Sequence, residues 1–266
     1  MGLITRVAVL MRDAAYFGPG FAFAVMWQRL TGRTVTVKLH GRKFVARSGS
    51  DLWTVRQIHL KAEYAIHTAH FAQQLKERLS AILAAGDRPV IVDAGANVGA
   101  ASAWFANQYP DAAIVAIEPD PGNAAMIRTN LGDLGQVTIL EAAIGATPGF
   151  VSTVPAETAW AIQTERASAG IPVVTVKQAV DRVERGRLFI AKIDIEGFEE
   201  DLFASETDWI DEAELVIVEP HDWMLPARRT SRNMQREMGR RSFAMLLNGE
   251  NLIYVRDRDQ PGAGAA

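Results

Sequence analysis

The sequence predicts an α/β fold built on a doubly wound, mostly parallel sheet of seven strands, and three observations support it. From Pro89 onward, short apolar runs alternate with helical patterns, as in folds whose parallel strands are covered by helices on both faces. The apolar runs are rich in β-branched residues and end at turn residues. Two strand-like runs joined by Gly249-Glu250 near the C-terminus predict an antiparallel hairpin at one edge.

An accessory segment, residues 1–86, is expected to precede the sheet. Residues 14–27 are apolar, but this run of about 14 residues is shorter than the roughly 20 needed to cross a bilayer. Gly18-Pro19-Gly20 also interrupts it, and no cleavage site typical of a signal peptide follows. We therefore expect no transmembrane segment but a helical segment packed on the domain. Peripheral contact with a membrane surface or a partner is the alternative.

The rest of the accessory segment predicts a hairpin and one long helix. Residues 34–47 alternate apolar and polar side chains around a turn at His40-Gly41. Apolar residues then recur at spacings of three and four, which predicts a single amphipathic helix that Gly86 can end. These residues are Leu60, Tyr64, His67, Phe71, Leu75, Leu79 and Ile82.

The core domain is expected to span residues 87–258, followed by a disordered tail, 259–266. Its strands are predicted near 89–94, 113–118, 137–142, 188–194 and 214–219, and its terminal hairpin at 243–248 and 251–255. Its helices are predicted at 98–108, 121–132 and 198–205. The stretch between the third strand and Val173 is predicted to be irregular.

Composition narrows the classes of protein to which this chain can belong. The formal net charge of −3 gives no case for nucleic-acid binding by the whole chain. The chain has no cysteine, which excludes disulfides, thiolate nucleophiles and thiolate metal sites. The lack of cysteine fits a reducing compartment, and a cytoplasmic location is expected.

The stretch VIVDAGANVGAAS (90–102) follows the first core strand, where a ligand would bind in an open parallel sheet. Its spacing, Asp93-x-Gly95-x-x-x-Gly99, differs from the dinucleotide fingerprint G-x-G-x-x-G, which would have glycine in place of Asn97. No lysine or arginine occurs from Val90 to Ile127, so a phosphate-rich ligand is disfavoured and a cationic nucleoside cofactor is favoured.

Glu118 closes the next strand, where an acid can accept hydrogen bonds from both hydroxyls of a ribose. It lies about 23 residues after Gly95, the distance at which dinucleotide-binding folds carry their ribose-binding acid. The turn and this acid together favour a ligand that carries a nucleoside.

The chain resembles S-adenosylmethionine-dependent methyltransferases, and in particular the FkbM family. The resemblance rests on the ordered blocks SGSDLWTVRQIHLKAEY, VDAGANVG, AIEPDPGNAAMIRTNL, EAAIGATPG, KIDIEGFEEDLF and VIVEPH, which span about residues 47–221. It implies that residues 87–258 bind S-adenosyl-L-methionine. Asp93, Gly95 and Gly99, with Asn97 in the same turn, would line its methionine portion. Glu118 would hold the ribose, and Glu141 with Ala142 would lie beside the adenine.

Candidate catalytic residues follow the fourth and fifth core strands. Asp194 ends one strand, while Glu219, a candidate substrate-binding residue, and His221 end the next. His221 is the first choice as general base, because the ordinary histidine pKa is near 6.5. Alternatively, Asp194, Glu219 and His221 could bind a divalent metal that acidifies a hydroxyl.

Other residues have two readings. Glu199, Glu200 and Asp201 are expected to stabilise the start of a helix. Trp160 could line a substrate pocket or cover the core. The arginines of 228–241 predict a solvated helical face, with an acidic substrate or an anionic membrane as the alternative.

These observations predict an enzyme that transfers a methyl group from S-adenosylmethionine to a hydroxyl oxygen of a small molecule or sugar. The choice of oxygen rests on the resemblance alone. Two other functions stay open: an NAD-dependent oxidoreductase, which the glycine spacing and the terminal hairpin disfavour, and a non-catalytic protein that binds a nucleoside cofactor.

Overall fold

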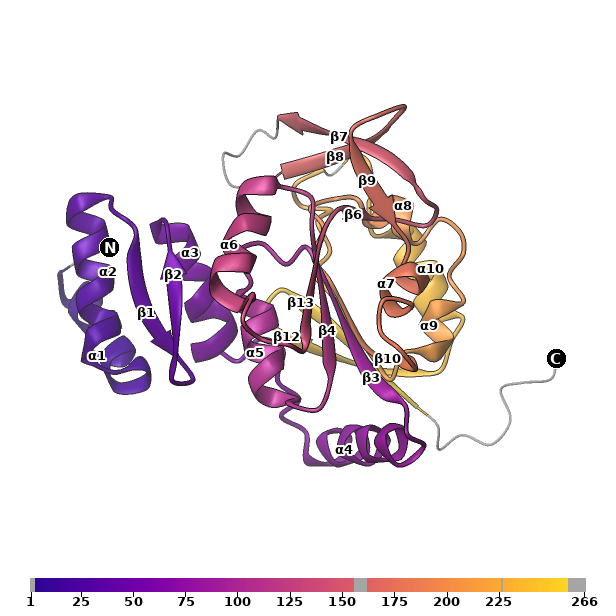
Figure 1. Cartoon of the computed structure of the whole chain (residues 1–266), viewed down its shortest axis with the longest axis horizontal. Helices are drawn as coiled ribbons and strands as arrows, with labels where there is room; N and C mark the ends of the chain where they lie inside the picture. Colours follow the sequence, from indigo (N-terminus) through magenta and orange to yellow (C-terminus); the bar gives the residue numbers. More distant parts are fainter. Residues whose placement is uncertain (1–2, 156–161, 226, 258–266) are drawn as a thin grey trace.

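The seven-stranded sheet predicted from the sequence forms the centre of the protein (Figure 1). The computed structural model describes residues 3–155, 162–225 and 227–257. Across the sheet the strand order is β12-β13-β11-β10-β3-β4-β5. The strands are β3 (Arg88–Ala94), β4 (Ala113–Glu118), β5 (Val137–Glu141), β10 (Gly186–Ile193), β11 (Leu215–Val218), β12 (Phe243–Asn248) and β13 (Asn251–Arg256).

The sheet has the predicted parallel core and antiparallel edge. Five strands run parallel, and β13 pairs antiparallel with both β11 and β12. Within this sheet, the chain first forms β3, continues outward through β4 to β5, and then returns to the other side of β3 at β10. This reversal places a topological switch point at the carboxyl ends of β3 and β10, where open α/β sheets bind ligands.

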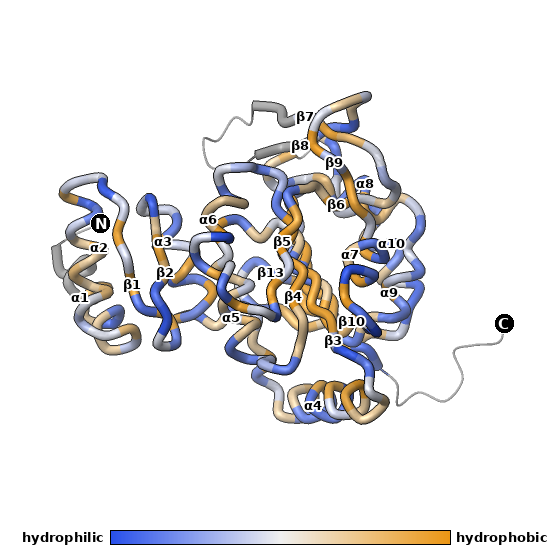
Figure 2. Tube along the Cα trace, in the orientation of Figure 1, coloured by the Kyte–Doolittle hydropathy of each residue, from blue (hydrophilic) through white to orange (hydrophobic). Residues whose placement is uncertain are grey.

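Helices cover both faces of the sheet, which explains why most residues of its central strands are apolar (Figure 2). On one face, α4 (Ala69–Ala84) and α5 (Ala100–Gln108) pack on Ile91 and Ile114. On the other face, Val92 and Val115 pack with side chains of α7 (Val176–Val180), α8 (Glu199–Leu202), α9 (Trp209–Glu212) and α10 (Arg232–Gly239). The helix α6 (Pro121–Leu131) covers Ala116 of β4.

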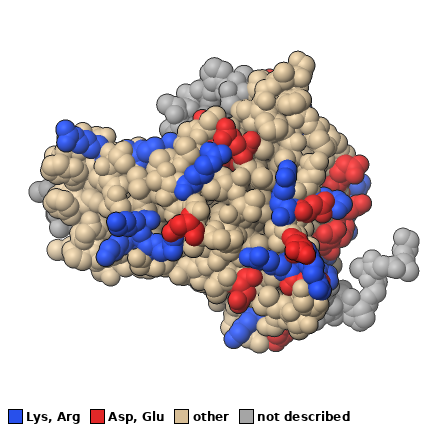
Figure 3. All heavy atoms as spheres, viewed as in Figure 1, with Lys and Arg blue, Asp and Glu red and all other residues tan. Residues whose placement is uncertain are grey.

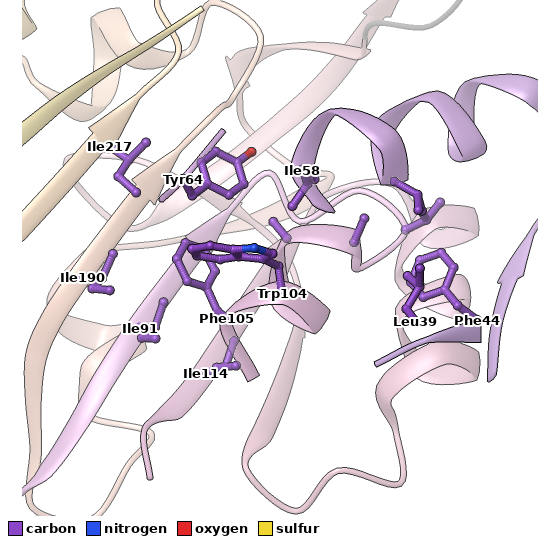
Figure 4. Close-up of a cluster of buried hydrophobic side chains, with 14 of the residues drawn as sticks. Leu39, Phe44, Ile58, Tyr64, Ile91, Trp104, Phe105, Ile114, Ile190 and Ile217 are labelled. Atoms are coloured by element: carbon purple, nitrogen blue, oxygen red, sulfur yellow. The ribbon is translucent and has the colours of Figure 1, made fainter. Parts of the chain in front are cut away.

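The prediction of one amphipathic helix through Leu60 and Ile82 was wrong. The π-helical turn η1 (Arg56–Leu60) ends at Leu60, and α4 begins only at Ala69. Between them Ala62 adopts a positive φ of 52°, and Tyr64 turns inward to stack on Phe105, with 5.6 Å between ring centroids (Figure 4). Packing of this aromatic ring in the core outweighs the local helical pattern.

The N-terminal segment forms two helices, a hairpin and a short helix at one end of the protein (Figure 1). These are α1 (Leu3–Phe17), α2 (Pro19–Thr31), β1 (Val35–Leu39), β2 (Arg42–Ala46) and α3 (Gly49–Val55). The predicted helical segment and hairpin are confirmed, and the chain breaks between the two helices at Gly18-Pro19. In the described residues, no helix combines the length and the apolar character needed to cross a membrane.

A second sheet lies where the sequence predicted irregular structure. It contains β6 (Ala143–Ile144), β7 (Gly149–Pro155), β8 (Ile162–Ala167) and β9 (Ile171–Val174), in the order β6-β9-β7-β8. The prediction failed because β8 (IQTERA) is rich in polar and charged residues, and because Gly170, at a positive φ, separates it from the short strand β9. Helix α8 is also shorter than the predicted 198–205. The predicted tail lies outside the described residues.

Candidate active site

A cavity of about 940 Å³ opens at the carboxyl ends of β3, β4, β10 and β11. The turns after these strands line one side of it, and residues from 47 to 64 of the N-terminal segment line another. Arg47 ties the two parts together, because its guanidinium donates to Asn123 of α6 at 2.7 Å and to Asp51 of α3 at 3.3 Å. The cavity is therefore built from two distant parts of the chain.

The glycine turn lies at this cavity, but its glycines are required by protein packing. Gly95, Asn97 and Gly99 all have positive φ, of 74°, 50° and 86°. A Cβ on Gly95 would lie 1.7 Å from the backbone oxygen of Asp194, so only glycine fits beside β10. A Cβ on Gly99 would lie 3.1 Å from Leu131 of α6. Gly95 and Asn97 line the cavity, whereas Gly99 faces α6.

Glu118 is held rigidly at the end of β4. Its carboxylate accepts the backbone N–H of Asn97 at 2.8 Å and that of Asp120 at 3.0 Å. Burial raises the pKa of Glu118, and these hydrogen bonds oppose the increase. Oε1 also accepts from the side-chain amide of Asn123 at 3.4 Å, whereas Oε2 accepts only from Asn97 among the described residues and keeps a lone pair for a ribose hydroxyl.

Asp93 and Lys192 form a buried pair behind the glycine turn. Oδ2 of Asp93 accepts the Ser102 hydroxyl at 2.6 Å, and Oδ1 lies 3.2 Å from Nζ of Lys192. Nζ also donates to the carbonyl of Gly95 at 2.8 Å and lies 3.3 Å from Asp194. Burial alone would lower the pKa of Lys192, but the charges of Asp93 and Asp194 raise it well above its ordinary value.

The pair therefore fixes the turn that carries Gly95. Asp93, expected to line a cofactor, is fully buried and is not among the residues that line the cavity in the described chain. Sequence reasoning gave Lys192 no role, although a lysine inside the apolar strand LFIAKI was a visible signal.

His221 lies at the centre of four carboxylates. Its Nδ1 is 2.8 Å from Oε1 of Glu199, and its Nε2 is 3.6 Å from Asp194, 3.6 Å from Glu196 and 3.9 Å from Glu219. Asp194, Glu196, Glu219 and His221 line the cavity. Adjacent pairing of β10 and β11 brings them together, as expected for Asp194, Glu219 and His221.

The carboxylates change the acid–base properties of the cluster. Burial lowers the pKa of a histidine, but the hydrogen bond to Glu199 and the surrounding negative charges outweigh it and raise the pKa of His221 to about 9. Burial and the charge of Asp194 raise the pKa of Glu196 to about 7 and that of Glu219 to about 8. Since the protons are shared among neighbours, the cluster can take up or release a proton near neutral pH.

Glu199 was missed by sequence reasoning, which treated it as a helix-stabilising acid. It is buried at the first position of a four-residue helix, and its carboxylate orients the ring of His221. Its two neighbours also have side-chain partners: Glu200 pairs with Arg228, and Asp201 pairs with Arg166. The spacing Glu196-x-x-Glu199 was the only signal, and it does not show that a histidine 22 residues later would be the partner.

Of the two residues expected near adenine, one lines the cavity and the other lies on the surface. Ala142 lines the cavity, together with Ala143 and Ile144. Glu141 instead pairs with Arg128 at 2.9 Å on the surface. Trp160, the expected substrate residue, lies outside the described residues.

Two exposed tryptophans that the sequence did not single out line the cavity. Trp53 and Trp223 are 52% and 57% exposed. Nζ of Lys61 lies 5.1 Å from the ring centre of Trp53. Aromatic rings that line a cavity offer apolar surface to a ligand.

The site fits a cationic nucleoside cofactor better than an anionic one. Glu118 is placed for a ribose, apolar Ile117 and Ala142 line the same cavity, and acids surround the region beyond Gly95. The positive charge of Lys192 is already compensated by Asp93 and Asp194. In the described residues, Asp194, Glu219 and His221 also offer three ligand atoms within 4.8 Å of one another, a set that could hold a metal ion.

The arginines of 228–241 are largely occupied by the protein's own acids. Glu237 pairs with Arg236, Arg240 and Arg241, and Arg241 also pairs with Asp211. These pairs support the solvated helical face that the sequence predicted and leave less charge for an acidic ligand.

Comparisons with known proteins found similarities to methyltransferases. Part of the chain is 37% identical over 67 residues to 2-O-methyltransferase NoeI of Sinorhizobium fredii, covering 25% of this chain and 28% of that protein. Among solved structures, a proposed caffeoyl-CoA O-methyltransferase from Staphylococcus aureus has a TM-score of 0.41 and 12% identity, covering 76% of this chain and 92% of the other. A proposed O-methyltransferase from Klebsiella pneumoniae also has a TM-score of 0.41, with 14% identity and coverages of 77% and 90%.

The chain also matches a described protein family. Residues 93–242, more than half of the chain, match the family described as Methyltransferase FkbM domain. This range contains the glycine turn, Glu118 and the whole cluster around His221. The protein is therefore a member of the FkbM methyltransferase family, a family of S-adenosylmethionine-dependent methyltransferases.

Proposed function

We propose that this protein transfers the methyl group of S-adenosylmethionine to a hydroxyl oxygen of a small molecule or sugar. The observation that carries the proposal is that one cavity contains both Glu118 and the cluster around His221. When bound, S-adenosylmethionine supplies an electrophilic methyl group on a sulfonium cation. Gly95, Asn97, Glu118 and Ala142 would hold it, and the cluster is where an acceptor hydroxyl would lose its proton.

His221 is the proposed general base. Nδ1 donates to the Glu199 carboxylate, so the neutral ring presents the lone pair of Nε2 toward the cavity. A raised pKa means that this lone pair is protonated at neutral pH in the protein alone. A positive charge bound nearby would lower the pKa of His221, because like charges disfavour the protonated form. Proton removal of this kind adds about a hundred- to ten-thousandfold to a rate.

The cavity favours a neutral polyol as acceptor. Five carboxyl groups line its acceptor side, against the amines of Lys61 and Lys192 and the imidazole of His221, and this excess of acidic groups disfavours a phosphorylated or carboxylated acceptor. The carboxyl groups are those of Glu63, Asp194, Glu196, Glu219 and Glu250. Trp53 and Trp223 line the same cavity and add aromatic surface against which the apolar face of a sugar can pack. The name of NoeI, a 2-O-methyltransferase, also favours oxygen as the acceptor atom.

A divalent metal is a second candidate for activating the hydroxyl, favoured by the close ligand atoms of Asp194, Glu219 and His221. Such an ion would acidify the hydroxyl, so that a weaker base would suffice. Chelation distinguishes the two mechanisms. Loss of methyl transfer with EDTA and recovery with Mg²⁺ or Mn²⁺ would support activation by a metal. Unchanged activity in EDTA would support His221 acting alone.

The experiment combines binding and turnover. Calorimetry with S-adenosylhomocysteine and with NAD should show binding of the first only. Transfer of labelled methyl groups from S-adenosylmethionine is then measured on neutral glycosides and on the matching sugar phosphates, with neutral glycosides expected to react faster. Binding of NAD alone would overturn the cofactor. Binding of S-adenosylhomocysteine with no methylated acceptor, and no effect of His221→Ala, would favour the non-catalytic alternative.

We place this reaction in the cytoplasm, which the absence of cysteine favours.

A further inference from the structure

Helices α1 and α2 carry an uncovered apolar surface that the proposed reaction does not use. Its six large side chains are between 45% and 79% exposed, and we call them the α1–α2 apolar surface: Met11, Tyr16, Phe23, Met26, Trp27 and Leu30. In soluble proteins, exposed apolar side chains of this size are usually scattered singly. Six of them on two successive helices of 15 and 13 residues therefore point to a partner.

The pattern on α2 shows that this exposure is a second face of the helix. Phe21, Ala24 and Val25 form the buried face and belong to the core beside β1 and β2. Phe23, Trp27 and Leu30 follow one another at spacings of four and three, which places them on a separate stripe. A helix that is apolar on both sides is normally covered on both sides.

The charge of this end of the protein indicates what would cover it. Residues 1–50 contain eight basic residues: Arg6, Arg12, Arg29, Arg33, Lys38, Arg42, Lys43 and Arg47. Their only acid is Asp13, which is buried against Arg56. Because the whole chain has 28 basic and 31 acidic residues, the remaining residues have 20 and 30. On the face seen in Figure 3, the left-hand end shows Lys and Arg but no Asp or Glu.

We propose that α1 and α2 dock this protein on an anionic membrane surface. Tryptophan, tyrosine and leucine side chains would enter the headgroup region, and the exposed arginines Arg12, Arg29 and Arg33 would bind anionic lipid headgroups. The helices would lie on the bilayer and not span it, in keeping with their length and apolar content. A second copy of the chain fits this surface less well, since it would bring the same arginines together.

Docking at this site would also position the active site. The buried ion pair between Arg56 and Asp13 links α1 to the segment that lines the cavity, and the guanidinium of Arg56 lies 5.9 Å from the ring centre of Phe21 in α2. A membrane bound by α1 and α2 would therefore hold the cavity wall at a fixed place relative to the lipid surface.

The test is co-sedimentation of the full chain with vesicles of phosphatidylcholine alone and of phosphatidylcholine mixed with phosphatidylglycerol. Binding to the anionic vesicles should be at least about tenfold stronger and should weaken at high salt. The pair Trp27→Ser and Leu30→Ser should reduce binding about tenfold or more, as should Arg29→Gln with Arg33→Gln. Matched controls are Met245→Ser with Leu247→Ser, exposed apolar residues of β12, and Lys177→Gln.

Equal loss of binding in the β12 control, or no preference for anionic vesicles, would overturn the proposal. Light scattering tests the alternative that a second copy of the chain covers this surface. A dimer that Trp27→Ser with Leu30→Ser converts to a monomer, in a protein that binds neither vesicle, would assign the surface to a second copy of the chain.

Discussion

Nδ1 of His221 lies 2.8 Å from Oε1 of Glu199, although the two residues come from different turns of the chain. The bond fixes which nitrogen of His221 faces the cavity, because Nδ1 is occupied by the Glu199 carboxylate and Nε2 points toward Asp194, Glu196 and Glu219. A carboxylate that orients a histidine and stabilises its protonated form is a recurring arrangement in enzymes that use histidine as a base. Four predictions follow from this site and its supports.

The first concerns the pH dependence of methyl transfer. A general base works when deprotonated, so activity should rise with pH, and the raised pKa of His221 places the rising limb above neutral pH, toward about 9 in the free enzyme. Glu199→Gln removes the main cause of the increase, so the limb should move down by about one unit or more while the maximal rate falls about tenfold. The measurement is kcat/KM against pH for both proteins. A limb that stays in place would show that His221 is not the titrating base.

The second concerns Glu118. Glu118→Ala should weaken binding of S-adenosylhomocysteine at least about tenfold, because a hydrogen bond to a charged acceptor contributes roughly 1.5–3 kcal/mol. Calorimetry provides the affinity. Glu141→Ala is the matched control, since Glu141 ends the adjacent strand β5 but pairs with Arg128 on the surface. Equal losses in both variants would mean that Glu141 also binds the cofactor. His221→Ala should retain cofactor affinity and lose turnover.

The third concerns the buried pair. Lys192→Met leaves Asp93 and Asp194 without their shared cation and should lower the free energy of unfolding by about 3–5 kcal/mol, as measured by urea denaturation. Adding Asp93→Asn should recover part of this loss. Lys177→Met, which removes an exposed pair with Asp181, should change stability by less than about 0.5 kcal/mol. If the double variant were no more stable than Lys192→Met, the charge of Asp93 would not be what Lys192 compensates.

The fourth concerns stability in acid. Nε2 of buried His59 faces the carbonyl oxygen of Ala100 at 3.1 Å and therefore donates to it, while Nδ1 accepts from His40 at 2.9 Å. Burial is the main reason that the pKa of His59 is lowered to about 4, from about 6.5 in the unfolded chain. The unfolded state then binds more protons, so stability should fall as the pH drops from about 6.5 to 4, by roughly 3 kcal/mol in total.

Thermal unfolding at pH 7.5 and at pH 5 checks this prediction. His59→Gln should be destabilised at pH 7.5 but should lose less Tm between the two values than the unchanged protein. His67→Gln, at an exposed histidine, should behave like the unchanged protein. The same acid-induced loss in the His59 variant would assign the pH dependence to another group.

The sequence by itself determined the sheet and the other elements whose apolar residues follow a local pattern. Strands such as β4, whose residues are all buried, need an unbroken run of apolar residues, and that run is visible without a structure. The positions of Asp194 and Glu219 at strand ends also followed from the chain, because the carboxyl ends of parallel strands share one edge. The family blocks indicated the cofactor in the same way.

Only the tertiary structure decided how side chains from distant segments meet. Tyr64 left its helical pattern to stack in the core, Glu199 became the partner of His221, and Lys192 was placed between two aspartates. The same holds for Gly95, whose hydrogen faces the backbone of Asp194. Such contacts depend on how strands and helices pack against one another. Local periodicity does not encode this packing, because it is set by the burial of side chains and the pairing of charges between the elements.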